Sequence, residues 1–127
     1  NIVRNLSADG PYPSPMAGFG VGINVEADST VTGNVIENAP LAGIRIGWGP
    51  FLRNVTASGN VIRKAKTGII VSVVEGAGRA VISGNVFEDT PAGAIVGHRW
   101  ADAVTSDLLD SGSEEMPHLT LAGNHAG

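Results

Sequence analysis

The sequence predicts an all-β chain wound as a right-handed parallel β-helix, a solenoid of about four to five coils. A Gly-Asn dipeptide recurs at spacings of 26, 25 and 39 residues, each time beside or within an apolar segment. The chain also contains 18 glycines, and only 5% of its residues are aromatic. Glycine destabilises helix interiors, so this composition argues against a helical bundle. Units of this length that stack on one another are typical of a solenoid.

Each unit holds two short segments separated by turn residues. Val and Ile fit a pleated, half-buried surface, and Gly and Asn suit the turns between segments. The first segments, which contain the Gly-Asn dipeptide, cover residues 31–36, 57–62, 82–87 and 121–126. The second segments cover residues 22–25, 42–46, 67–71 and 93–96. Asn1 is the expected asparagine of the unit that contains residues 23–25.

Alternation within the segments predicts inward columns of apolar side chains. The clearest column is Ile23, Ile44, Ile69 and Ile95. The other predicted columns are Val31 with Ala57, Ile82 and Leu121; Ile36 with Ile62, Phe87 and Ala126; and Val25 with Ile46 and Val71. Stacked copies bury a continuous core that one copy cannot bury alone. Parallel crossovers are almost always right-handed, which sets the expected hand.

Two columns of polar residues have a structural interpretation. The asparagines of the repeated dipeptide are expected to hydrogen-bond to one another as a structural ladder. They are Asn34, Asn60, Asn85 and Asn124. In a second column Arg63 should lie between Glu37 and Glu88, and in the next column Lys64 should lie beside Asp89. Such pairs favour stacking by roughly 0.2–1 kcal/mol each.

Two segments interrupt the spacing and are predicted to be loop insertions. Residues 6–21 contain Pro11, Pro13 and Pro15, which exclude a strand ladder. Residues 101–118 lengthen the last full unit and are rich in Asp and Glu. Insertions in solenoids often carry binding sites, so this segment is either a binding loop or a solvated flap over the end of the stack.

Composition excludes several classes of protein and site. The formal net charge of −4 is not that of a nucleic-acid-binding protein. No apolar run is long enough to span a membrane. The absence of cysteine excludes disulfides and thiolate sites, and the histidines lack metal-ligand spacing. We therefore expect no cofactor and no metal.

The expected partners are a carbohydrate and further copies of the chain. The sequence starts within a unit, which suggests the C-terminal part of a longer chain, and no capping helix is evident after residues 119–121. Exposed strand edges favour pairing, so end-to-end association is expected unless residues 101–118 cover one end.

The candidate functional residues lie near the ends of the second segments. Glu26 and Asp28 would share a face if their strand continued, as an acid/base pair requires. The positions stacked on them would be Gly47 and Gly49, which add no acid. Asn24 and Arg45 should be stacked neighbours, with Glu26 as a second option for Arg45.

Aromatic residues suggest a sugar-binding surface. His98, Arg99 and Trp100 form a polar and aromatic trio, and Trp48 is expected about 10 Å from Trp100, two strand spacings away. These rings either stack on sugars or pack beneath loops. The full set of candidate glycan-contacting residues is Asn24, Glu26, Arg45, Trp48, His98, Arg99 and Trp100.

The units V-x-G-N-V-I and A-G-I-x-I resemble the right-handed β-helix repeats of pectate-lyase-like proteins. From about Gly18 to Gly127 the chain is similar to the C-terminal part of the twin-arginine-translocated repeat proteins of bacteria. The resemblance implies export, so that the protein would be periplasmic or secreted. Related lyases and hydrolases use a calcium-binding acidic cluster with a nearby Arg or Lys, or acids on adjacent coils. Neither arrangement is found, so no catalytic residue is transferred.

Two functional hypotheses follow. The chain is either a non-enzymatic structural or glycan-binding module, or a polysaccharide lyase or glycoside hydrolase whose active site lies partly outside residues 1–127. A groove that joins carboxylates with Arg45 would favour the enzyme. A flat face of Thr, Ser and Val would favour the module.

Overall fold

The computed structural model describes residues 1–6 and 20–127. Strands make up 63% of these residues and helix 4%, which confirms the all-β prediction. Almost all of the predicted proline-containing loop, residues 7–19, lies outside the described residues. The one described helix has four residues and is too short to cross a membrane.

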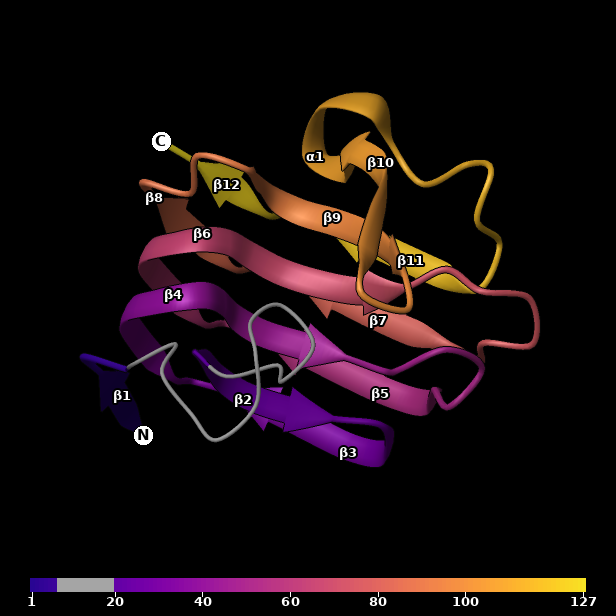
Figure 1. Cartoon of the computed structure of the whole chain (residues 1–127), viewed down its shortest axis with the longest axis horizontal. Helices are drawn as coiled ribbons and strands as arrows, with labels where there is room; N and C mark the ends of the chain where they lie inside the picture. The colour runs from indigo at the N-terminus through magenta and orange to yellow at the C-terminus, as the bar shows by residue number, and fades with distance from the viewer. Residues whose placement is uncertain (7–19) are drawn as a thin grey trace.

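The strands form two sheets built from parallel pairs, except that β10 pairs antiparallel with β9 (Figure 1). The larger sheet runs β1-β4-β6-β8-β12, with β2 paired to β4 and β9 paired to β6. Its strands are β1 (Ile2–Arg4), β2 (Val21–Val25), β4 (Val35–Ile46), β6 (Val61–Ser72), β8 (Val86–Glu88), β9 (Gly93–Arg99), β10 (Asp102–Asp107) and β12 (His125–Ala126). The second sheet runs β11-β7-β5-β3 and consists of β3 (Ala27–Thr32), β5 (Arg53–Ser58), β7 (Ala80–Ser83) and β11 (Leu119–Ala122).

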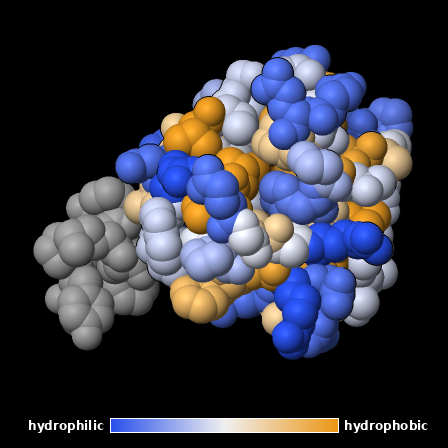
Figure 2. All heavy atoms as spheres, turned by 90° about the vertical axis from the view of Figure 1, so that its right-hand side faces the viewer, coloured by the Kyte–Doolittle hydropathy of each residue, from blue (hydrophilic) through white to orange (hydrophobic). Residues whose placement is uncertain are grey.

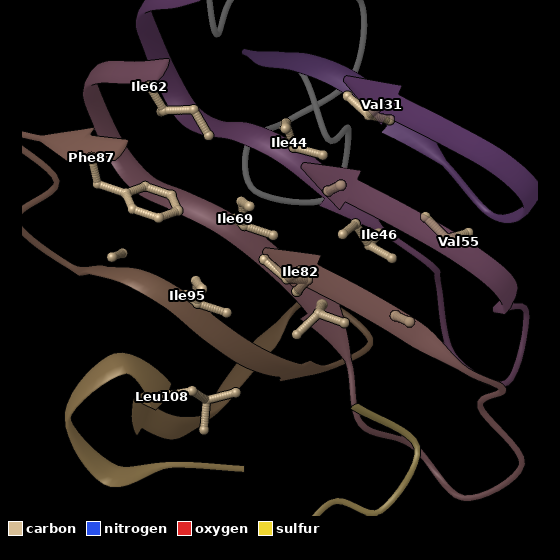
Figure 3. Packing of buried hydrophobic residues seen from close by; sticks show 14 of the residues in the cluster. Val31, Ile44, Ile46, Val55, Ile62, Ile69, Ile82, Phe87, Ile95 and Leu108 are labelled. Atoms are coloured by element: carbon tan, nitrogen blue, oxygen red, sulfur yellow. The ribbon is translucent and has the colours of Figure 1, made fainter. Parts of the chain in front are cut away.

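The observed register matches the predicted apolar columns. Ile44 pairs with Ile23 on one side and with Ile69 on the other, and Ile69 pairs in turn with Ile95. The register also aligns Val31 with Ala57, Ile36 with Ile62, Ile62 with Phe87, and Ile46 with Val71. These side chains fill the space between the two sheets (Figure 3). The core therefore follows the period-2 alternation of the sequence.

The Gly-Asn dipeptide has two separate structural roles. The glycines adopt positive φ, at +65° for Gly59 and +64° for Gly84, which is unfavourable for residues with a Cβ. The asparagine that follows is buried and hydrogen-bonds along its column. Asn60 Nδ2 donates to Asn85 Oδ1 at 2.9 Å, and Asn60 Oδ1 accepts from Asn34 Nδ2 at 3.0 Å. Asn85 Nδ2 donates to Asn124 Oδ1 at 2.9 Å, so the four amides form one continuous chain.

The two predicted charged columns differ in whether ion pairs form among the described residues. Arg63 lies 3.5 Å from both Glu37 and Glu88, as predicted. Lys64 takes part in none of the ion pairs among the described residues, and its backbone adopts a positive φ of 56°. Asp89 has the same conformation, with φ of 57°. This column is therefore a corner of the backbone. Lys64 and Asp89 form no ion pair among the described residues, and the placement of Lys64 beside Asp89 stays a prediction.

Residues 101–118 differ from the predicted loop. They contain strand β10, which pairs antiparallel with β9, followed by the short helix α1 (Leu108–Ser111). The Asp107 carboxylate accepts from the backbone N–H groups of Ala94 and Ile95, and Leu108 is only 2% exposed within the core. At this edge of β9, the Asp107 carboxylate accepts the hydrogen bonds that the backbone of a further parallel strand would otherwise accept. Strand β10 and helix α1 thus cover the edge of β9, and they precede residues 119–121. End-to-end association stays a prediction.

Candidate functional site

The candidate site is built around a guanidinium and two indole rings. Asn24 and Arg45 are neighbours in register on β2 and β4, where Asn24 is exposed and Arg45 is half-buried. The Arg45 guanidinium carbon lies 5.3 Å from the centre of the Trp48 ring, within cation–π range. Burial lowers the pKa of Arg45 from its ordinary value. The guanidinium is thus held against an aromatic ring, and no ion pair of the described residues joins it to Glu26.

Trp48 and Trp100 are closer together than the sequence suggested. Their ring centres are 5.5 Å apart at an interplanar angle of 78°, an edge-to-face contact. The predicted separation of about 10 Å assumed two strand spacings between the residues. Instead, Trp100 begins the two-residue turn between β9 and β10, and this turn returns the indole toward Trp48. The antiparallel strand, which the sequence did not reveal, brings the two rings together.

The Trp100 indole is held by an unusual backbone and a close approach to glycine. Trp100 has a φ of 57°, which is rare for a bulky residue. A Cβ added to Gly49 would lie 2.3–2.6 Å from three carbons of the Trp100 ring, so a larger residue there would displace the indole. The Trp100 residue nevertheless remains 45% exposed. One aromatic side chain is therefore fixed in position and still open to solvent.

His98 and Arg99 precede this turn and have different surroundings. His98 is half-buried, and its pKa is lowered by burial and by the nearby charge of Arg45. Its Nδ1 has no hydrogen-bond partner among the residues that the structure describes. Arg99 Nη2 donates to Glu75 Oε2 at 2.9 Å on the surface, and this contact lowers the pKa of Glu75. His98 therefore belongs to the Arg45 surroundings, whereas Arg99 already has a carboxylate partner.

Glu26 and Asp28 do not form an acid pair on one strand. Glu26 lies between β2 and β3, and Asp28 adopts a φ of 50°, so the strand does not continue as assumed. The register around Ala27 and Arg53 places Asp28 beside Asn54, whereas Gly49 had been expected there. The Asp28 carboxylate accepts from Arg53 Nε and Nη2, which lowers its pKa. The two acids thus have separate surroundings.

A hollow near Glu26 contains residues that the sequence analysis did not select. It measures about 480 Å³ and is bordered by three successive turns of the chain. Phe51 contributes an aromatic side chain that is 60% exposed. The hollow is lined by Glu26, Ala27, Pro50, Phe51, Leu52, Arg53, Gly76 and Gly78. An aromatic residue directly after Gly-Pro was the only sequence signal for this feature.

The second sheet carries two outward rows of small side chains, and the charged Asp28 and Arg53 lie near the starts of its strands β3 and β5. Thr30, Thr56, Val81 and Thr120 are aligned in one row. A second row consists of Thr32, Ser58, Ser83 and Ala122. This is the face of small Thr, Ser and Val side chains that was expected of a non-enzymatic module. Within residues 1–6 and 20–127, no group of three His, Asp or Glu side chains is arranged to hold a metal ion.

Comparisons with protein-family models, with curated proteins and with solved structures each found no match to this chain.

Proposed function

We propose that the chain is a right-handed parallel β-helix module that binds a glycan without catalysis. The β-helix is supported by the alternation of strands between two parallel sheets and by a register that joins residues 25 or 26 apart. The Asn60 amide, for example, joins residues 26 before it and 25 after it. Parallel crossovers strongly favour the right hand.

Glycan binding is supported above all by the arrangement of Arg45, Trp48 and Trp100. A solvent-exposed indole offers an apolar face to a sugar ring, and a guanidinium donates hydrogen bonds to hydroxyl or carboxylate oxygens. The left-handed backbone of Trp100 stores strain, and such strain concentrates at functional positions. Asn24, beside Arg45, adds a side-chain amide to the same face.

The absence of catalysis is supported by the separation of the charged groups. Asp28 is paired with Arg53, and Arg45 lies against Trp48 rather than in an ion pair with Glu26. The aligned rows of Thr and Ser on the second sheet also favour a module. A periplasmic or secreted location is part of the same proposal and depends only on the resemblance to exported β-helix repeats.

A polysaccharide binding screen tests the proposal. Native affinity electrophoresis in gels that contain single polysaccharides should show retardation for at least one of them, and Trp100→Ala should abolish it. Val104→Ala removes an exposed apolar side chain of β10 and should leave the retardation unchanged. A lack of retardation by every polysaccharide tested would contradict glycan binding. Release of shortened or unsaturated oligosaccharides would favour the lyase or hydrolase alternative.

A further inference from the structure

The hollow around Phe51 shares no lining residue with the Arg45, Trp48 and Trp100 contacts, although it adjoins them through the backbone hydrogen bonds between Phe51 and Trp48. Its wall consists of the turns β2–β3, β4–β5 and β6–β7, all on the face seen in Figure 2, where hydrophobic and hydrophilic side chains are intermixed. Its volume of about 480 Å³ is that of a small-ligand site. None of the contacts that define the Arg45, Trp48 and Trp100 array includes a residue of this hollow.

Backbone hydrogen bonds hold the three turns together. Arg53 N donates to Glu26 O at 2.9 Å, and Gly78 N donates to Leu52 O at 2.7 Å. Phe51 N and O both bond to the backbone of Trp48, so the backbone that carries the Phe51 ring is fixed. A Cβ at Gly78 would lie 2.5 Å from Leu52 O, so this close approach of two turns requires glycine. The hollow is therefore preformed.

The charges around the hollow favour a cationic ligand. The guanidinium of Arg53 is engaged by both carboxylate oxygens of Asp28. Glu26 is exposed, and it takes part in none of the ion pairs formed among residues 1–6 and 20–127. The hollow thus combines one carboxylate without a cationic partner in the described residues with an exposed aromatic ring. An aromatic ring beside a carboxylate attracts an ammonium group through both cation–π and charge interactions.

From these observations we infer that the hollow is a binding site for an amino sugar, a pyranose with a free ammonium group. The apolar face of the pyranose stacks on Phe51, and the ammonium group donates hydrogen bonds to the Glu26 carboxylate. The inference rests on the proposed glycan-binding function and specifies a ligand class for a second part of the surface. It predicts preference for oligosaccharides of glucosamine over their N-acetylated counterparts, because acetylation removes the positive charge.

Calorimetric titration with glucosamine oligomers, N-acetylglucosamine oligomers of the same length and oligolysine tests this inference. We expect the glucosamine oligomer to bind at least tenfold more tightly than the acetylated one. Glu26→Gln and Phe51→Ala should each weaken that binding at least tenfold, and Phe51→Tyr should retain it. Glu115→Gln makes the same charge change on an exposed residue outside the hollow and should have no effect.

The outcomes separate this site from the proposed function. Equal binding of oligolysine would overturn the sugar, since a cation alone would then suffice. Equal binding by Glu26→Gln would overturn the role of the carboxylate. If Trp100→Ala abolishes glycan binding while the hollow variants bind like the original protein, the proposed function stands and the hollow is not a site. If the hollow variants lose the glucosamine oligomer while Trp100→Ala keeps it, the hollow binds and the Trp100 surface does not.

Discussion

Strands β6 and β10 belong to the same sheet but are held in it by different kinds of contact. β6 has parallel partners along both sides and pairs residues of similar type, such as Ile69 with Ile44 and Ile95. β10 pairs only with β9, in the antiparallel sense and with an irregular register. Its final residue, Asp107, accepts hydrogen bonds from the β9 backbone. The regular region thus depends on contacts made at every strand, and the β10 region on a few individual side chains.

This difference determines how each region should respond to substitution. A ladder asparagine inside the regular region has hydrogen-bond partners on both sides. Its loss therefore leaves several buried polar groups without hydrogen bonds. A residue at the covered edge has neighbours on one side only, and solvent can reach the groups that its loss exposes. We expect the largest effects in the asparagine column, intermediate effects at Asp107, and the smallest at exposed ion pairs.

Asn60→Ala should produce the largest loss of stability. The substitution removes acceptors for the backbone N–H and side-chain amide of Asn34, and donors to Asn85 Oδ1 and Val31 O. Asn60 is fully buried, and each stranded buried group costs roughly 1–3 kcal/mol, so we expect a loss of about 3 kcal/mol or more. Chemical denaturation monitored by circular dichroism measures the difference.

Arg63→Ala is the matched comparison for Asn60→Ala. Arg63 lies three residues after Asn60, in β6, and also contacts side chains on both neighbouring strands, at 3.5 Å each, but it lies at the surface. Its removal should cost less than about 1 kcal/mol. Equal shifts of the denaturation midpoint for the two variants would contradict the interpretation that the asparagine column stabilises the stack through buried hydrogen bonds.

The regular region could be predicted because its physical requirements recur at fixed positions in the chain. Burial selects Ile at residues 44, 69 and 95, and a left-handed turn selects Gly immediately before each ladder asparagine. Corners were harder to predict. Asn38, Lys64 and Asp89 share a positive φ although their side chains differ, so the sequence suggested a column of charges where the backbone makes a corner.

Removal of the Asp107 side chain tests the β10 region. Its carboxylate accepts from the backbone N–H groups of Ala94, Ile95 and Leu109. Asp107→Ala should therefore destabilise the chain by about 2 kcal/mol, less than Asn60→Ala. Faster hydrogen exchange should appear at Ala94 and Ile95, with little change in β6. Glu115→Ala, an exposed acid of the same segment, should leave both quantities unchanged, and unchanged exchange in Asp107→Ala would contradict the capping role.

The candidate site was only partly predictable because it depends on this same non-repeating region. The stacking of Asn24 on Arg45 follows from the spacing of the units and is observed. The contact between Trp48 and Trp100 requires the turn that leads into β10, and no repeated pattern specifies that turn. Phe51 was missed because it lies in a turn, where burial does not select the residue type. A single exposed aromatic residue also leaves no repeating pattern in the sequence.

Compared with the asparagine column and the Asp107 contacts, the exposed Asp28–Arg53 ion pair should show the smallest effect on stability. It joins the regular strands β3 and β5, yet it is an individual side-chain contact and it is exposed to solvent. The hydrogen bonds from Arg53, with its positive charge, lower the pKa of Asp28 from the ordinary value of 3.8. A lowered pKa in the folded state stabilises the fold above the ordinary pKa, and this stabilisation is lost as pH falls through the folded value. Because both side chains are exposed, salt should weaken the effect further.

NMR titration of the Asp28 carboxyl should show its pKa rising toward the ordinary value in Arg53→Ala, whereas Arg99→Ala should leave it unchanged. An Asp28 pKa that stays low without Arg53 would assign the shift to the turn itself, whose left-handed backbone would then position the carboxylate independently of the ion pair.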